Sequence, residues 1–168
     1  MSTRPPHLFP YHGIRIMNQE DYNQLDYNYA HCAGTNCPKA NQCLRHTAYT
    51  LLYTNTREYF TVTNPQVITG RQPCPAYDAD RKERFAWGIS HIYDNVRAAD
   101  LHRVKQEVMS CFSTSLYYHI KQQRRAITEK EQSCIRSAIT DMGYDGNLIE
   151  FDRYEEQYPT LMRIARQK

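Results

Sequence analysis

Four cysteines in the first half of the chain constrain its fold more than any other feature. Cys32, Cys37 and Cys43 lie within twelve residues, and Cys74 follows in the segment Gln-Pro-Cys-Pro-Ala. Thiolates that stand close together repel each other unless a cation or a covalent bond joins them. The clustering therefore predicts one organised centre to which all four cysteines contribute.

The spacing of the four cysteines is C-x4-C-x5-C-x30-C. Structural zinc sites commonly use four thiolates; the first spacer suits zinc, and the second is longer than usual. Iron–sulfur clusters also take four thiolates, at more varied spacing. We predict a structural zinc centre, with an iron–sulfur cluster or metal-free thiols as alternatives. His31 and His46 flank the cluster and could each replace a thiolate or be ordinary histidines.

A length of 168 residues fits one domain, or one domain with an appended module. We expect an irregular arm and a cysteine knuckle over residues 1–77 and a helical region over 78–168, packed as one domain.

No apolar stretch approaches the roughly 18 residues that span a bilayer, and the N-terminus does not resemble a signal peptide. The expected location is cytoplasmic, with no membrane partner. Cys111 and Cys134 are then expected to be small buried apolar side chains.

Apolar periodicity predicts mostly helices. We expect an arm packed through Phe9, Tyr11 and Ile14, and short strands at 60–63 and 148–151. The expected helices are 40–53, one from Asp78 or Asp80 to about 96, 99–110, 113–125 and 129–142, with a short one after Asp152. Thr128 and Glu131 form a capping box, and Gly143 suits the position after a helix. The fold class predicted is mainly α: a helical bundle with a helix-turn-helix-like unit, an N-terminal four-cysteine knuckle and little β.

Positive charge is concentrated in the middle of the chain. Residues 81–125 carry nine basic and four acidic side chains, a net charge of +5, whereas the whole chain has a net charge of only +3. Such a local excess indicates a polyanionic partner, most often nucleic acid. The alternative is a solvated helix face, which would leave an acidic protein as the partner.

Short junctions between the helices expected at 99–110, 113–125 and 129–142 resemble those of a helix-turn-helix, whose second helix enters the DNA major groove. A plain three-helix bundle would show the same pattern. The side chains that could contact phosphates or base edges come from the first two helices and their ends. They are Arg103, Lys105, Tyr117, Tyr118, Gln122, Arg124 and Arg125.

Two stretches resemble a family of unknown function found in gut anaerobes. One is the cysteine motif from His31 to Arg45, with Asn-Pro at 64–65 and Cys-Pro at 74–75 downstream; the other runs from Phe85 to Gly143. The resemblance spans about residues 27–158 and implies that the cysteines and the helical half belong to one architecture. Residues 113–143 also resemble helix-turn-helix segments of phage-type regulators, but have Gln-Gln-Arg where those often have glycine.

Motifs typical of catalysis are missing from the sequence. It contains no phosphate-cradling glycine loop, no Gly-x-Ser-x-Gly and no His-Glu-x-x-His. An enzyme is therefore not the favoured interpretation. We expect a small nucleic-acid-binding protein with a structural metal centre, such as a regulator or a mobile-element accessory protein. The alternatives are a protein-interaction module stapled by metal and an iron–sulfur redox or sensing protein.

Overall fold

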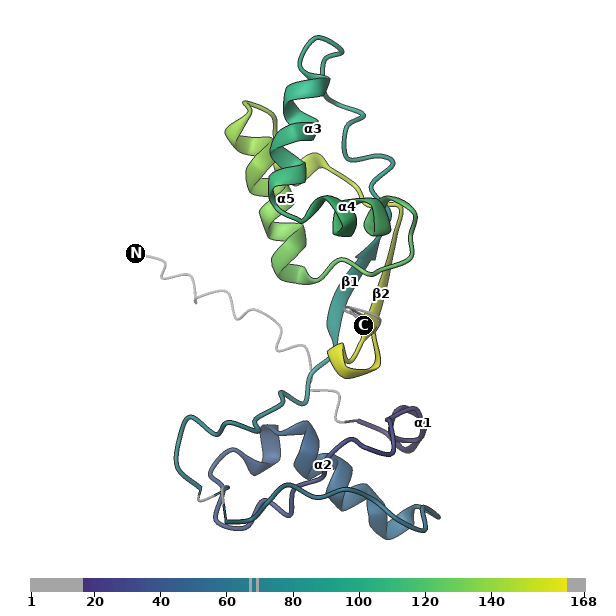
Figure 1. Ribbon diagram of the computed structural model, residues 1–168, viewed down its shortest axis with the longest axis vertical. Helices are drawn as coiled ribbons and strands as arrows, with labels where there is room; N and C mark the ends of the chain where they lie inside the picture. Colours follow the sequence, from purple (N-terminus) through teal and green to yellow (C-terminus); the bar gives the residue numbers. More distant parts are fainter. Residues whose placement is uncertain (1–16, 67, 69, 163–168) are drawn as a thin grey trace, which may run out of the picture. The chain divides into compact units, whose positions relative to one another are not determined.

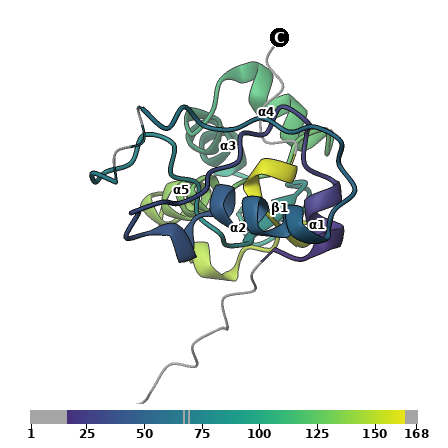
Figure 2. The same cartoon turned by 90° about the horizontal axis from the view of Figure 1, so that it is seen from below.

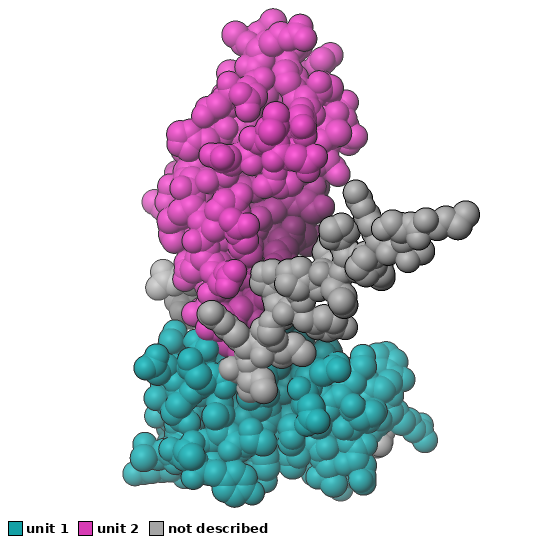
Figure 3. Space-filling model, turned by 180° about the vertical axis from the view of Figure 1, so that it is seen from behind, with its two compact units in different colours: residues 1–81 teal, residues 82–168 magenta. Residues whose placement is uncertain are grey.

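The computed structural model describes residues 17–66, 68 and 70–162. The chain divides into two compact units, residues 1–81 (unit 1) and 82–168 (unit 2), which Figure 3 colours teal and magenta. Within the described residues, no helix has the length and apolar character needed to cross a membrane. The arm contacts predicted for Phe9, Tyr11 and Ile14 lie outside the described residues.

Unit 1 consists of short helices joined by long irregular segments (Figure 1). In chain order the helices are α1 (Gln19–Asn23), η1 (Ala40–Gln42), α2 (Leu44–Leu51) and η2 (Leu52–Thr54). The helix predicted over 40–53 is confirmed, as α2 extended by a 3-10 turn at each end. The strand predicted over 60–63 is wrong: of these residues only Val62 pairs, in one parallel bridge with His31.

Arg45, near the start of α2, joins the segments before and after that helix. Its guanidinium donates to the carbonyl oxygens of Ala30 and Ala76, both at 2.8 Å. It also lies over the ring of Tyr29, 4.7 Å from the ring centroid. Because one guanidinium provides several donors in a fixed plane, it can bind the backbone of both irregular segments at once.

Unit 2 is built on an antiparallel strand pair. β1 (Glu83–Trp87) pairs with β2 (Arg153–Gln157), so that Glu83 lies opposite Gln157 and Trp87 opposite Arg153. Ile127 exchanges two backbone hydrogen bonds with Ala86, at 2.8 and 3.0 Å. The remaining elements are α3 (Leu101–Ser110), α4 (Thr114–Lys121), α5 (Glu129–Asp141), η3 (Gly146–Leu148) and η4 (Pro159–Leu161) (Figure 1, Figure 2).

The core of unit 2 lies where α3, α5 and β1 meet. α3 packs against α5, and α5 packs against β1 (Figure 1). Fully or almost fully buried side chains come from every one of these elements and from α4. They include Ala86, Val104, Val108, Ile120, Ile127, Ile135, Ile139 and Phe151. Burial of these side chains supplies the main driving force for folding of the unit.

The predicted fold class is wrong. Unit 2 is not a helical bundle with a helix-turn-helix-like unit, because its helices share their core with an antiparallel sheet. The four-cysteine knuckle is also not formed: the described residues contain no group of three or more His, Cys, Asp or Glu side chains that could hold a metal ion. The chain instead forms two units. Unit 1 contains short helices, and unit 2 combines helices with one antiparallel strand pair.

The helix predicted from residues 78–80 to 96 is strand β1 followed by turns. Phe85 and Ala86 are both fully buried, so apolar residues follow each other directly and imitate one helical face. Gly88 then takes φ +72 with its Cα so close to the carboxylate of Asp152 that a Cβ would collide with it. The strand predicted at 148–151 and the helix predicted after Asp152 are wrong as well, because β2 occupies 153–157.

The three helices predicted between residues 99 and 142 are confirmed, with one shortened. The capping box of α5 forms: Thr128 N donates to Glu131 at 2.9 Å, and Glu131 N donates to the Thr128 hydroxyl at 3.3 Å. α4 ends at Lys121, earlier than predicted. Gln123 adopts φ +53, a left-handed conformation that cannot continue a right-handed helix.

The prediction for Cys111 and Cys134 is wrong, because they form a disulfide that links the end of α3 to α5. Packing of the two helices brings the Cα atoms of Cys111 and Cys134 to within 6.1 Å of each other, which is in the usual range for a disulfide. Spacing along the chain could not reveal this approach, since the two cysteines are 23 positions apart in the sequence.

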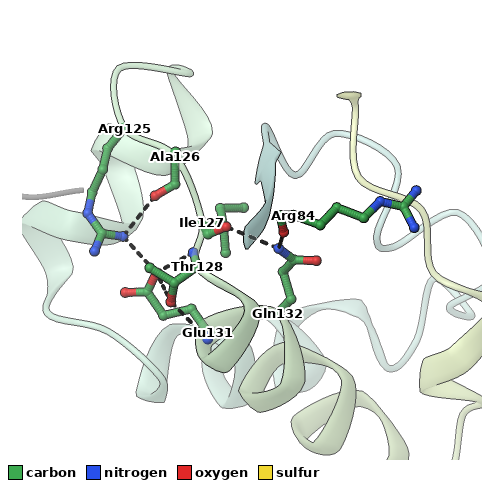
Figure 4. Close-up of polar contacts among 7 residues, drawn as sticks. All are labelled: Arg84, Arg125, Ala126, Ile127, Thr128, Glu131 and Gln132. Carbon is green, nitrogen blue, oxygen red and sulfur yellow. Dashed lines mark hydrogen bonds and ion pairs between the residues drawn. The ribbon is translucent and has the colours of Figure 1, made fainter. Parts of the chain in front are cut away.

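Gln132 should be important for the stability of unit 2. Its side-chain amide donates to the carbonyl oxygens of Arg84, at 2.7 Å, and Ile127, at 3.1 Å, and so joins β1 to α5 (Figure 4). Gln132→Met keeps the volume but leaves these buried acceptors without that donor, which should lower the free energy of unfolding by about 1–3 kcal/mol. Urea unfolding followed by Trp87 fluorescence measures this. Lys130→Met, an exposed change on the same helix, is the control; equal unfolding of both variants would contradict the assignment.

Candidate thiol cluster and candidate nucleic-acid interface

The four predicted ligand cysteines are free thiols in unit 1. Cys43 is buried and immediately precedes α2, while Cys32, Cys37 and Cys74 are half-buried in the adjoining loops. All four line one small cavity of about 20 Å³. The Cys32 N–H donates to the carbonyl oxygen of Arg45, at 3.0 Å, which holds the first loop against α2. The cysteines are therefore neighbours around a cavity.

The wide spacing explains why these neighbours do not form the predicted knuckle. Between Cys32 and Cys37 the backbone makes a turn in which Gly34 and Asn36 have φ +69 and +57. The five residues between Cys37 and Cys43 include the separate 3-10 turn η1. Cys32 and Cys37 thus flank one turn, and η1 separates Cys37 from Cys43, unlike the single tight turn that presents both thiols of a closely spaced pair. Zinc, with an iron–sulfur cluster as the alternative, stays a prediction for these thiols.

The two flanking histidines have different roles. His46 lines the same cavity as the cysteines, and its Nδ1 is 3.2 Å from the carbonyl oxygen of Cys32. His31 has no exposed surface, and both of its ring nitrogens are engaged: Nε2 with the Tyr22 hydroxyl at 2.9 Å and Nδ1 with the Thr61 carbonyl oxygen at 3.0 Å. Since the carbonyl oxygen of Thr61 can only accept, Nδ1 carries the proton and Nε2 accepts from the Tyr22 hydroxyl. His31 is therefore a structural residue of the core.

Burial lowers the pKa of His31 below its ordinary value of 6.5, because the charged form loses its hydration; the hydrogen bond to Thr61 opposes this only in part. Burial also raises the pKa of Tyr22, against the opposing effect of the Arg57 guanidinium, so the hydroxyl that faces His31 stays protonated. A neutral imidazole and a neutral phenol are thus the favoured pair in the folded state.

The predicted nucleic-acid residues are divided among three places in unit 2. Tyr118, Gln122 and Arg124 are exposed on α4 and in the turn after it, as predicted. Tyr118 exposes 48% of its surface, and its ring packs edge-on against Tyr117 with centroids 5.7 Å apart. Among the described residues, Arg124 has no carboxylate partner.

Tyr117 and Lys105 lie away from that exposed face. A side chain that contacts phosphates or base edges must be exposed, but only 6% of Tyr117 is, so that expectation is wrong for Tyr117. Its hydroxyl is 3.3 Å from that of Tyr93. Lys105 is half-buried, with its ammonium 5.5 Å from the centre of the Tyr93 ring. Sequence analysis missed Ser90, Tyr93 and Lys121, which line one pocket with these two residues. A sequence signal existed for Lys121 alone, because it follows Tyr117 by four residues on the same helical face.

The remaining two predicted residues are held elsewhere. Arg103 points away from Lys105, since two residues on a helix turn by roughly 200°; it lies 3.5 Å from Asp100 and is largely exposed. Arg125 is mostly buried, forms an ion pair with Glu131 at 2.9 Å and donates to the carbonyl oxygen of Ala126 at 3.1 Å (Figure 4). Arg125 therefore stabilises the start of α5, and its guanidinium does not lie with the exposed side chains of Tyr118, Gln122 and Arg124.

Comparison with known proteins identifies the class of this chain. Residues 16–160 match a family of unknown function, DUF6078. Because the match covers most of the sequence, the protein belongs to this family, and the predicted resemblance to an uncharacterised family is confirmed at that level. No curated protein and no solved structure is significantly similar to the chain.

Acid should destabilise unit 1 through His31. Its pKa is lower folded than unfolded, so the unfolded state binds more protons. The contribution of His31 is complete above the unfolded pKa of 6.5 and declines as the pH falls through that value toward the folded pKa. Amide exchange of α2 measured on both sides of this window should show the decline, and His31→Gln should flatten it. His91→Gln, in the other unit, is the control; an unchanged slope in His31→Gln would exclude His31 as the cause.

Metal binding by the thiol cluster is tested by melting and elemental analysis. If zinc bridges the loops of unit 1, its binding energy adds to folding, by an amount on the order of 10 kcal/mol in small zinc domains. Protein expressed with added zinc should then retain the metal, and its melting temperature should fall after chelation. The melting temperature of Cys43→Ser should not change on addition of chelator. The control is Cys111→Ser with Cys134→Ser, which removes two sulfurs outside the cavity. The zinc prediction would be refuted if the purified protein contained no metal and its melting temperature did not change on addition of chelator.

Proposed function

We propose that unit 2 binds nucleic acid through the surface formed by α4 and the turn that follows it (the α4 surface: Tyr118, Lys121, Gln122 and Arg124). The observation that carries the proposal is that all four side chains are exposed on one continuous segment. Within the described part of the chain, neither Lys121 nor Arg124 has an acidic partner. Both cations are available to an external anion.

Phosphate contacts and base contacts would come from different members of this surface. Lys121 and Arg124 are suited to phosphates, whose neutralisation releases counterions and gives affinity without sequence preference. The Tyr118 ring, braced by Tyr117, offers a face on which an unpaired base can stack. Gln122, one turn after Tyr118, carries an amide that can donate to and accept from a base edge.

Single-stranded nucleic acid fits this surface better than a duplex groove. α4 has only eight residues and ends at the left-handed Gln123, whose amide donates to Asp152 at 3.0 Å. A helix that short presents few side chains to a major groove, while one aromatic ring beside two cations forms a small stacking platform.

A second candidate function is a protein-interaction module, and one observation favours it. Unit 1 exposes several aromatic side chains: Tyr53 is 87% and Tyr59 67% exposed, and Tyr59 stacks on Tyr27 with ring centroids 5.4 Å apart. Exposed aromatic groups of this kind are common at protein interfaces.

Salt dependence of binding tests the nucleic-acid proposal. Affinity for a labelled single strand should fall steeply with salt, and Arg124→Ala should reduce the slope of log K against log salt by about one unit. Tyr118→Ala should weaken binding by about 1–3 kcal/mol with little change in slope, because stacking involves no counterions. Arg71→Ala, an exposed charge removal in unit 1, is the matched control. Absence of salt-dependent binding to single or double strands by the wild type would refute the proposal.

A further inference from the structure

A pocket of about 150 Å³ lies in unit 2 behind the α4 surface. Its walls come from the loop after β1, from α3 and from α4. The lining residues are Ile89, Ser90, Tyr93, Lys105, Tyr117 and Lys121. Pockets for drug-sized molecules usually begin at about 300 Å³, so this one suits a single chemical group better than a whole nucleotide.

The lining of this pocket is cationic. It includes two lysines and no acidic side chain. Within the described residues neither lysine forms an ion pair, and the ammonium of Lys105 is placed over the Tyr93 ring. Two like charges that share one pocket favour an anion between them, which would relieve their repulsion.

Hydroxyl groups add neutral hydrogen-bond donors. The Tyr93 and Tyr117 hydroxyls are 3.3 Å apart, and because one donates to the other, one hydroxyl proton of the pair remains for a ligand. Burial raises the pKa of Tyr93, and its contact with Tyr117 raises it further, so Tyr93 stays protonated. Ser90 uses its hydroxyl and its N–H on Asp152, at 3.0 and 2.8 Å, and serves as a fixed wall.

Asp152 lies beside one wall of the pocket, because Ser90 donates two hydrogen bonds to its carboxylate. Besides the two bonds from Ser90, it accepts the side-chain amide of Gln123 at 3.0 Å. These three donors point at the carboxylate and disperse its charge. The same bonds tie the loop after β1 to the turn after α4, and therefore hold two walls of the pocket in place.

We propose that this pocket binds a phosphomonoester, and that the group enters as the terminal phosphate of a nucleic-acid strand. A phosphomonoester carries about −1.5 to −2 charges near neutral pH, which two ammonium groups balance. An internal phosphodiester carries a single charge and is esterified on two sides, so it fits a pocket of this small volume less well. The terminal-strand part rests on the proposed function; the phosphomonoester part does not.

The location of Lys121 connects the pocket to the α4 surface. Lys121 lines the pocket and follows Tyr117 by four residues, while the next residue, Gln122, belongs to the exposed face. A strand whose terminal phosphate is held between Lys105 and Lys121 can therefore continue across Tyr118 and Gln122. Such a protein would distinguish strand ends from strand interiors.

Binding of matched oligonucleotides tests the proposal. One short single strand is prepared with a 5′-phosphate, with a 3′-phosphate and with hydroxyls at both ends, and fluorescence anisotropy gives the three affinities. One phosphorylated form should bind at least about tenfold more tightly than the hydroxyl form, the ratio expected for hydrogen bonds to charged groups. Equal binding of all three strands would overturn the proposal.

Variants locate the effect in the pocket. Lys105→Met with Lys121→Met should abolish the preference for the phosphorylated strand, and Tyr93→Phe should reduce it. Lys130→Met removes an exposed charge from α5 and should leave the preference intact. Each single lysine variant is measured as well, so that a folding defect of the double variant, checked by Trp87 fluorescence, does not decide the result. A preference that survives in both single variants would overturn the proposal.

Free ligands separate the failure of this proposal from failure of the proposed function. If no strand binds, the nucleic-acid function is refuted, and the pocket is titrated with inorganic phosphate and a nucleoside monophosphate by calorimetry. Saturable binding that Lys121→Met weakens, but Lys130→Met does not, would support the phosphomonoester site by itself. No binding of either free ligand would refute it.

Discussion

The pairing of β1 with β2 is the interaction on which the rest of unit 2 depends. It joins residues 83–87 to residues 153–157, so α3, α4 and α5 all lie within the loop that it closes. Closing such a loop costs chain entropy, which the buried side chains of α3, α5 and β1 must offset. The bridge from Ala86 to Ile127 and the amide of Gln132 secure the other edge of β1, where an unpaired strand edge would otherwise remain.

The same closure shapes the pocket for which we propose phosphate binding. β2 follows directly after Asp152, and this carboxylate accepts hydrogen bonds from Ser90, in the loop after β1, and from Gln123, in the turn after α4. Gly88 is required where the backbone passes closest to that carboxylate. Three segments far apart in the sequence are thereby fixed around Tyr93 and Tyr117. A ligand site made in this way can be rigid even though its residues come partly from loops.

Unit 1 is held together by a different balance of forces. Its described residues include few buried aliphatic side chains, and hydrogen bonds from Arg45 and from the buried His31 connect its irregular segments. Polar groups of this kind stabilise only when they are fully paired, and for this reason we expect the stability of the unit to depend on the protonation of His31. The four thiols face the cavity between these segments. A metal ion would add a further connection where apolar contacts are few, which is the reason that small domains with little core use such ions.

The sequence by itself determined the features that depend on neighbouring residues. The capping box at Thr128 and Glu131, the end of α5 before Gly143 and the helix near residues 40–53 follow from local hydrogen bonding and apolar spacing, and the structure has them. It also indicated family membership and the exposed Tyr118, Gln122 and Arg124.

Tertiary structure alone decided that residues 83–87 are a strand, that Cys111 forms a disulfide with Cys134, and that Tyr117 and Lys105 line a shared pocket. These outcomes depend on partners between 12 and about 70 residues away, and a periodic pattern along the chain contains no information about which distant segment will supply the other half of a contact.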